Sequence, residues 1–376
     1  MDDGSRLWTT GDGARATDAS VSPMKRNVLP RPTLLPGLTR LWRDRHTLQL
    51  GLDPARAVLL EVANPAAGRL LDLLDGTRSE RNILEHASRL SVPPDEARVL
   101  IDTLRDAGLV VGAQSLYPSE LPEPARRRLS AEVAAIALRG VDAPGTPAQV
   151  LRRRATAQVV VTGHGRLAAP VAVALAQAGV GHVSPDLAGE VAPVDAVGSG
   201  LTASDVHRPR AAAVTAAIAR VAPETRTRPV RRGKANLVVQ VGMDRPAELL
   251  AAGYAERRQA HLMLGLRDGT AVIGPLVVPA AGAPCVNCLD LHRQDRDPGW
   301  PTIAAQLSAS VATEPCGVPT LLSAVGYATG EILTFLDGGT PETVGGSVEI
   351  SAPGLLRRRA WPPHPRCSCR RRRRPR

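Results

Sequence analysis

Four of the five cysteines form two close pairs, and these pairs constrain the fold more than any other feature of the chain. The first pair is Cys285-Val-Asn-Cys288, and the second, far along the sequence, is Cys367-Ser-Cys369. Zinc prefers a tetrahedron of thiolates, and short loops commonly supply them in pairs. The pattern predicts that a structural zinc ion joins the end of the chain to the body of the fold.

Other interpretations of the cysteines stay open. The spacing of the second pair is tighter than is usual for zinc, and His364 is a candidate to replace a thiolate or to support the site from outside. The same sequence pattern would also fit two pairs of reduced cysteines that bind no metal. A disulfide is the weaker interpretation because nothing marks the chain as secreted. A closed four-thiolate site would be structural and would carry no chemistry by itself.

Length and composition indicate a globular protein of several domains. The chain has 376 residues, of which 43% are hydrophobic, enough for about two or three domains with real cores. There is no apolar signal stretch at the N-terminus and no run of about eighteen apolar residues that would span a membrane. Together with reduced cysteines, these features predict a cytoplasmic protein.

The net charge of +11 does not by itself indicate nucleic-acid binding. Arg370 to Arg374 and Arg376 supply more than half of it, in a terminal run that we expect to be solvated. Aromatic residues make up only 2% of the chain, so no stacking platform for single strands is evident. The charge distribution therefore disfavours a nucleic-acid partner.

The N-terminal third predicts a small winged-helix domain over residues 30–113, preceded by a polar, disordered arm at residues 1–29. Residues 47–52 and 57–62 alternate as paired strands do. Three helices follow, one over residues 65–75, one starting in a capping box at Thr77-Arg-Ser-Glu80, and one from Pro94 to just before Gly108. Residues 109–111 could close a small wing.

A winged helix can bind DNA, pack against a neighbour or bind a peptide. The third helix carries four acidic and two basic side chains, which suits a helix facing phosphates poorly; they are Asp95, Glu96, Asp102, Asp106, Arg98 and Arg105. A sheet edge beside a helix can instead capture an extended peptide by strand addition. We expect peptide binding at this domain.

A helical connector over residues 114–154 leads into an open α/β domain. A buried strand at residues 157–161 is followed by Gly163-His-Gly165 and a helix of small residues, which is how a nucleotide-binding unit begins. Further buried strands at residues 181–183, 236–241 and 271–278 alternate with helical segments. The expected architecture is a Rossmann-like, mostly parallel sheet.

The order of motifs in this second part resembles the ThiF-type family, relatives of the ubiquitin-activating enzymes. The resemblance rests on Val161-Thr-Gly-His-Gly165, Ala178-Gly-Val-Gly181, Asp205-Val-His-Arg-Pro-Arg210 and the two cysteine pairs. It covers residues 155 to about 370, with a ThiF-type domain at residues 155–350 and a zinc-closing segment and arginine-rich tail at residues 351–376. The family favours homodimers.

Further segments narrow the resemblance to a subgroup that carries an N-terminal leader-binding domain and is associated with azole-type peptide modification. They are the run at residues 288–301 and His364-Pro-Arg-Cys-Ser-Cys369. Residues 48–54 and 70–76 are similar to PqqD-like peptide-recognition domains (RiPP recognition elements). The resemblance implies two partners: a precursor peptide and a cyclodehydratase-type enzyme.

Adenylating members of the family bind ATP and Mg²⁺ through a glycine loop and a few charged residues. Carried over, the loop comprises Gly163, Gly165, Arg166 and Ala168, with Asp186 at the ribose position. Arg210 stands at the position of the family's Lys, and Asp244 at that of its metal-binding Asp.

The nucleotide site nevertheless departs from the family pattern. Arg166 should crowd the close backbone approach that a phosphate needs. The family's Asn-Leu-x-Arg-Gln segment is missing, which removes an arginine that stabilises phosphate charge during transfer. These departures predict a degraded ATP site, and Asp186 and Asp244 could equally be ordinary loop carboxylates.

The fifth cysteine, Cys316, lies where some sulfur-transferring relatives carry a reactive thiol. No histidine or lysine is near it in sequence, Glu314 opposes thiolate formation, and the apolar segment that follows suggests burial. A structural cysteine is the favoured interpretation, with a catalytic one as the alternative.

Two functions of different kinds remain. In the first, the protein binds a leader peptide on residues 30–113 and presents it to a separate modifying enzyme. In the second, it is an ATP-dependent adenylyltransferase that activates the C-terminal carboxylate of a small protein or peptide. A winged-helix DNA-binding regulator comes third.

Overall fold

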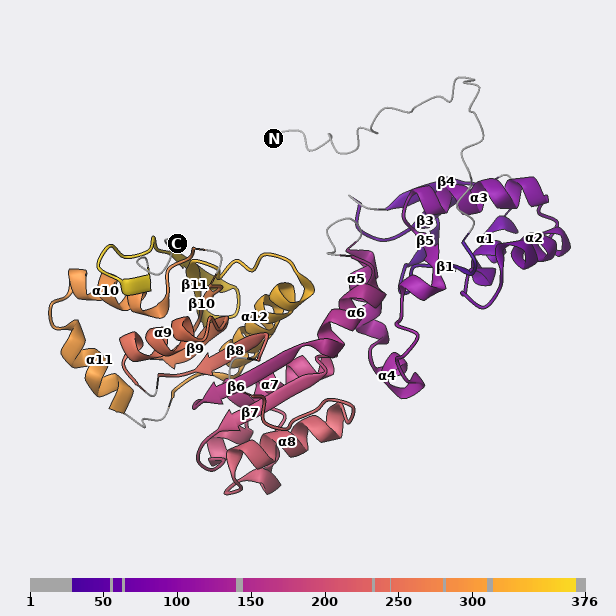
Figure 1. Cartoon of the computed structure of the whole chain (residues 1–376). Helices are drawn as coiled ribbons and strands as arrows, with labels where there is room; N and C mark the ends of the chain where they lie inside the picture. The colour runs from indigo at the N-terminus through magenta and orange to yellow at the C-terminus, as the bar shows by residue number, and fades with distance from the viewer. Residues whose placement is uncertain are drawn as a thin grey trace, which may run out of the picture.

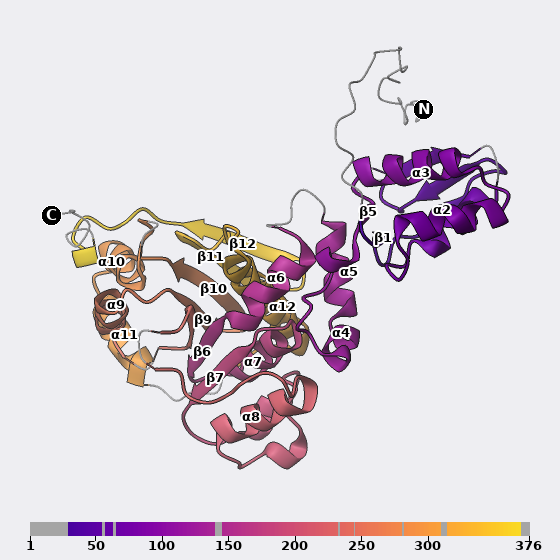
Figure 2. The same ribbon diagram turned by 45° about the vertical axis from the view of Figure 1, so that its right-hand side comes forward.

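The chain consists of an N-terminal module, a helical connector and a large α/β domain (Figures 1 and 2). A computed structural model describes residues 29–54, 57–62, 65–139, 145–231, 234–243, 245–279, 282–309 and 314–369. Residues 1–28 of the predicted arm and the arginines from Arg370 onward lie outside the described residues. Among the helices that are described, none is both long and apolar enough to cross a membrane.

The N-terminal module pairs a small antiparallel sheet with three helices. The sheet has the order β2 (Arg40–Trp42), β3 (Thr47–Leu50), β4 (Val58–Glu61). The helices are α1 (Ala67–Leu70, continued by a 3₁₀ turn), α2 (Glu80–Arg89) and α3 (Pro94–Asp106). They confirm the expected strands and helices, but β2 was not predicted.

Two local details of this module differ from the sequence prediction. Ser79, not Thr77, caps α2, because its Oγ accepts the N–H of Asn82 at 3.3 Å. After α3, β5 (Val110–Gly112) pairs with β1 (Pro32–Leu34) and does not extend the three-stranded sheet. The ends of the module are thereby tied to each other.

Alternation along the strands decides which face of this sheet is buried. Leu48, Leu50 and Leu60 point into the core, whereas Leu41 and Leu59 are 41% and 50% exposed on the opposite face. Helix α3 contributes residues three and four apart to the same core, as an amphipathic helix should; they are Ala97, Ile101 and Leu104.

Three connector helices follow, α4 (Glu123–Arg128), α5 (Ser130–Leu138) and α6 (Pro147–Thr156). Thr146 begins α6 in a capping box with Gln149. Leu129, Val133 and Leu151 join the hydrophobic core of the N-terminal module, so the connector packs onto it.

The α/β domain is built on a seven-stranded sheet of order β12-β11-β10-β9-β8-β6-β7. Its strands are β6 (Gln158–Gly163), β7 (His182–Leu187), β8 (Leu237–Val241), β9 (His261–Arg267), β10 (Thr270–Val277), β11 (Gly346–Ala352) and β12 (Leu355–Ala360). Strands β6 to β9 are mutually parallel, and β10 to β12 add antiparallel pairings. Because β11 therefore runs with the parallel set, the sheet is mostly parallel and Rossmann-like, as predicted.

Helices cover both faces of this sheet (Figures 1 and 2). Helices α7 (Ala168–Gln177), α8 (Arg210–Val221) and α12 (Val318–Asp337) pack together on one face. Helices α9 (Ala247–Glu256), α10 (Val286–Arg296) and α11 (Trp300–Ala309) lie on the other. β6 lies between β7 and β8, and the chain crosses from β7 past β6 to reach β8. In open α/β sheets, ligands bind at the carboxyl end of such a strand.

Candidate functional site

The glycine loop at the carboxyl end of β6 has a backbone that requires both of its glycines. Gly163 has φ +98°, and a Cβ there would lie 2.1 Å from the carbonyl oxygen of Val241. Gly165 has φ +122°, and its Cβ would lie 2.8 Å from a carboxylate oxygen of Glu314. Any larger residue would displace the next strand or this carboxylate.

Glu314 lies directly against the loop. Its Oε2 accepts the backbone N–H of Arg166 at 3.0 Å, just before α7 begins. Free amides at the start of a helix attract anions. Burial raises the pKa of Glu314 above its ordinary value, although the Arg166 amide, His164 and the Arg166 guanidinium act in the opposite direction.

Arg166 turns its side chain into the protein. The residue is only 7% exposed, and one terminal nitrogen donates to the carbonyl oxygen of Cys316 at 2.8 Å. Its Nε is buried and has no hydrogen-bond partner among the described residues. Within the described part of the chain, the cation therefore lies beside the loop and is bonded to a single carbonyl.

Arg210, at the family's Lys position, is already engaged by an acidic partner. One of its terminal nitrogens donates to Asp195 Oδ2 at 2.8 Å, and the other to the Ala188 carbonyl oxygen at 3.3 Å. Asp195 Oδ2 also accepts the N–H of Ala192 at 2.9 Å. The Arg210 charge is thus neutralised within the protein.

Two predicted nucleotide-site residues remain, Asp186 and Asp244. Asp186 is exposed at the carboxyl end of β7, with Thr162 Oγ1 at 3.4 Å from its Oδ2. Asp244 lies outside the described residues. The structure therefore brings Gly163, Gly165, Arg166, Asp186 and Arg210 to the carboxyl ends of β6 and β7.

Two side chains of this region were missed as site residues by sequence reasoning, namely Glu314 and Asp195. Both are far in sequence from the glycine loop, and acidic residues in loops carry no local signal of their partners. A useful signal would have been the unusual Arg166, because a buried arginine needs acceptors nearby.

Cys316 sits at the edge of the same region and is half-buried. Its Sγ contacts the Gly317 carbonyl oxygen at 3.6 Å. Burial raises the pKa of its thiol, with the Arg166 charge opposing and Glu314 adding to the rise. A raised pKa keeps the thiol protonated, which is the opposite of what a nucleophilic cysteine needs.

The second candidate site is the cysteine cluster, to which all four predicted cysteines contribute. Cys285 Sγ lies 3.8 Å from Cys288 Sγ and 3.6 Å from Cys367 Sγ, and Cys288 Sγ lies 3.4 Å from Cys369 Sγ. These sulfurs all lie within 4.8 Å of one another. Cys285 caps α10, and Cys288 lies in its first turn, where the helix dipole favours thiolates.

The sulfur spacing fits one tetrahedral zinc ion. With zinc–sulfur bonds of about 2.3 Å, the edges of a tetrahedron are roughly 3.8 Å long. A disulfide would need about 2.05 Å, so all four thiols are unbridged. Four adjacent thiolates would repel one another, so they are stable together only around a cation.

His364 is not part of this tetrahedron. Its ring Nδ1 accepts the N–H of Arg366 at 3.2 Å, so its Nε2–H donates to Asp295 Oδ2 at 2.7 Å. Together with Cys367, whose N–H donates to the His364 carbonyl oxygen at 3.0 Å, these bonds order the closing segment. His364 therefore supports the cluster from outside, one of the two roles expected for it.

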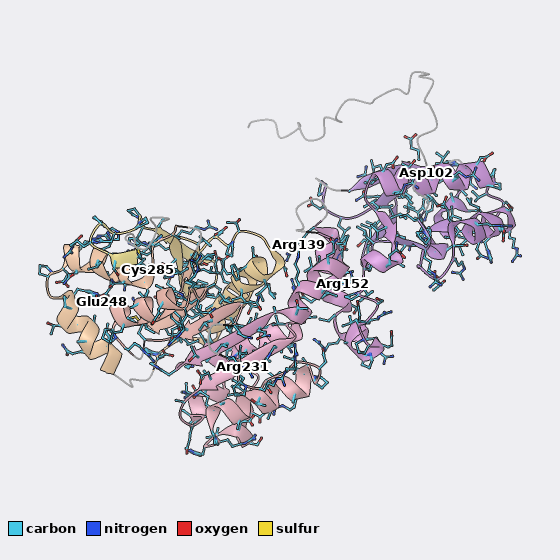
Figure 3. The ribbon with its side chains drawn as sticks, in the orientation of Figure 1. Asp102, Arg139, Arg152, Arg231, Glu248 and Cys285 are labelled. Atoms are coloured by element: carbon cyan, nitrogen blue, oxygen red, sulfur yellow. The ribbon has the colours of Figure 1, made fainter. Side chains whose placement is uncertain are left out.

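A cavity of about 650 Å³ lies between α9 and the cysteine cluster. Its lining includes Glu248, Tyr254, His261, Cys285 and Cys369. Figure 3 labels Glu248 and Cys285 at this end of the α/β domain.

Known structures share this fold. Crystal structures of E. coli MccB, one with MccA-N7isoAsn and one with ATP, align with TM-scores of 0.61 at 15% and 16% identity, over 90% of this chain and 99% of theirs. The structure of PaaA aligns with a TM-score of 0.62 at 15% identity, over 86% of this chain and 98% of that one. The fold is of the ThiF type. No protein-family model matches the sequence, and no curated protein matches it.

Proposed function

We propose that this ThiF-type-fold protein binds the leader of a precursor peptide on residues 30–113 and presents it to a separate cyclodehydratase-type enzyme, with a degraded ATP site. The observation that carries the proposal is the free edge of the three-stranded sheet. Among the described residues, β4 pairs with β3 on one side and with no strand on the other.

The backbone of β4 is suited to accept an added strand. The N–H of Val62 donates to the His46 carbonyl oxygen at 2.8 Å, so alternation along the antiparallel ladder directs the N–H groups of Leu59 and Glu61 away from β3. An extended peptide pairs with such groups, and its side chains can rest on exposed apolar neighbours. Leu59 of β4 is 50% exposed.

The structural neighbours support a peptide as the ligand. MccB is a microcin C7 biosynthetic enzyme, and its crystal structures include complexes with MccA-N7isoAsn and with N-formylated MccA. The shared fold extends over nine-tenths of this chain and so includes the N-terminal module as well as the α/β domain. This supports a peptide as a partner of either part. The ThiF-type resemblance also leads us to propose a homodimer.

The test uses the full chain and the leader peptides of any short precursors found by searching the neighbouring genes. Glu61→Pro removes one outward N–H of β4 and leaves the bonds to β3 intact, which an edge strand tolerates. We expect Glu61→Pro to weaken leader binding by roughly tenfold, about the value of one main-chain hydrogen bond. Glu61→Ala, which keeps the N–H, should bind as the wild type does, and equal binding by both variants would reject strand addition at β4.

An ATP-dependent adenylyltransferase remains the second candidate, favoured by the exposed Asp186 beside the glycine loop and by the MccB structure with ATP. ATP–pyrophosphate exchange distinguishes the two functions. We expect no exchange by the wild type or by Arg166→Gly. Robust exchange that Asp244→Ala abolishes would establish the adenylyltransferase instead.

We further propose that the cysteine cluster holds one structural zinc ion. Its support is the fit of four unbridged sulfurs to a tetrahedron. Free thiolates of this kind persist in a reducing compartment, which leads us to propose a cytoplasmic location.

A further inference from the structure

The glycine loop of the α/β domain already holds an anion, and this anion belongs to the chain itself. The Glu314 carboxylate accepts the Arg166 amide at 3.0 Å and lies where a Cβ on Gly165 would collide with it. A nucleotide phosphate would use the same amide and the same open space above the glycine.

A second observation marks this place as an anion site. Arg166 is more than nine-tenths buried, yet its Nε has no partner among the described residues. Its guanidinium makes a single bond there, to the Cys316 carbonyl oxygen. A buried cation with an unused donor is costly unless an anion lies close to it, and Glu314 lies next to it.

We propose that Glu314 is an internal substitute for a nucleotide phosphate and excludes ATP from the glycine loop. The proposal rests on the proposed function, in which the ATP site is degraded, and it identifies the group responsible. The two glycines of the loop are present, with φ +98° at Gly163 and +122° at Gly165, so no side chain of the loop itself blocks these positions. What prevents binding is the carboxylate, which a phosphate would meet as a like charge.

No other cation in the described site is free to offset that repulsion. Arg210 is bonded to Asp195, and the Arg166 guanidinium interacts with the Glu314 charge without a direct bond to it. Removing the carboxylate would free the Arg166 amide and leave the nearby guanidinium, whose Nε is unpaired among the described residues, to offset the charge of an incoming phosphate.

The test is binding of Mg²⁺–ATP to the full chain, measured by isothermal titration calorimetry. We expect Glu314→Gln, which keeps an acceptor oxygen but loses the charge, and Glu314→Ala, which also clears the space, to bind at least roughly tenfold more tightly than the wild type. Glu256→Gln is the matched control, because this exposed glutamate lies on α9, on the other face of the sheet. It should bind as the wild type does.

A double variant assigns the gain to Arg166. Adding Arg166→Gln to Glu314→Ala should return the affinity to the wild-type level, because the guanidinium that offsets the phosphate charge is gone. If neither Glu314 variant binds more tightly than the wild type, the inference is wrong while leader binding at β4 is untouched. If the wild type already binds as tightly as Glu314→Ala, the inference is also wrong and the adenylyltransferase gains support.

Discussion

Two buried arginines, Arg154 and Arg166, show that the same residue type serves different purposes in this fold. Arg154 is 1% exposed and makes a two-pronged pair with Asp337, at 2.9 and 2.8 Å, plus a bond to Glu132 at 2.9 Å. Arg166 has no carboxylate bonded to its side chain within the described residues. Arg154 thus joins α5, α6 and α12, whereas Arg166 keeps unused capacity beside the glycine loop.

Replacing Arg154 should destabilise the protein strongly. Arg154→Met leaves Asp337 buried without its partner, so we expect a loss of about 3–5 kcal/mol in the free energy of unfolding. Urea unfolding followed by circular dichroism measures it. Arg152→Met is the matched control, because Arg152 is exposed on the same helix (Figure 3) and should change stability little.

A second variant separates the lost pair from lost packing. Arg154→Met combined with Asp337→Leu removes the stranded charge and should recover much of the stability. A double variant as unstable as Arg154→Met alone would show that shape, and not charge, dominates at this position.

His261 should make stability fall in mild acid. It is buried and stacks on Tyr254 with ring centroids 4.1 Å apart, and burial lowers its pKa from 6.5 to about 4. A histidine with a depressed pKa contributes its full stability above pH 6.5 and loses it as the pH falls from 6.5 to about 4. The loss amounts to about 3 kcal/mol at most.

His261→Phe is the variant that measures this effect, since it keeps the aromatic stack and removes the titration. Relative to the wild type, its free energy of unfolding should improve progressively between pH 7 and pH 5. Taking the difference between the two proteins cancels the acid response of the cysteines. A difference that stays constant over this range would contradict the assignment.

At the scale of single elements, one face of α10 binds the closing segment of the chain. Cys288, His292 and Asp295 are four and three residues apart, so they share one helix face. That face binds the closing segment through the sulfurs, through the bond of His292 Nε2 to the Pro362 carbonyl oxygen at 2.9 Å, and through the pair of Asp295 with His364. One helix therefore fixes the end of the described chain.

The cysteine cluster should bind one metal ion that depends on the distal pair. Purified wild-type protein is expected to contain about one zinc per chain, measured by plasma mass spectrometry. Cys369→Ser should lose the metal and make the closing segment sensitive to protease. Cys316→Ser is the matched control and should keep full zinc, because Cys316 lies at the glycine loop. Full zinc in Cys369→Ser would exclude the distal pair from the site.

At the scale of the whole molecule, the N-terminal module is joined to the α/β domain by helices that pack onto the module's core and onto the large domain. Leu151 of α6 joins the N-terminal core, while Arg154 of the same helix pairs with Asp337 at the end of α12. A peptide held at β4 would thus be attached to the α/β domain through a packed connector.

The salt dependence of binding distinguishes a peptide partner from a DNA partner. Leader binding by strand addition depends on main-chain hydrogen bonds, so its affinity should change little with salt. DNA binding would instead fall with a slope of about −0.9 per phosphate contact on a log–log plot. Titrations of the full chain with leader peptide and with duplex DNA at several salt concentrations distinguish them, and tight, salt-sensitive DNA binding without peptide binding would reject the proposal.

The sequence by itself determined what depends on short-range patterns. Alternating residues specify the strands at 47–52 and 57–62. Glycines specify the turn after β6, which is of the kind found at phosphate sites, and small residues specify helix α7. Each of these elements is set by a few neighbouring residues. The sequence also predicted the four-cysteine cluster, because two close pairs of cysteines can meet in few ways. Strands β1 and β2 escaped prediction because each has only three residues, and β9, β11 and β12 were not assigned from the pattern.

Only the tertiary structure decided which distant groups meet. Glu314 reaches Gly165 and Arg166 across 148 positions of sequence, and Arg154 reaches Asp337 across 183. No local pattern encodes such contacts, since an acidic side chain in a loop has the same composition whether it faces water or a buried amide. The sequence therefore predicted a damaged nucleotide site through Arg166, whereas the fold alone placed the Glu314 carboxylate against the amide of the glycine loop.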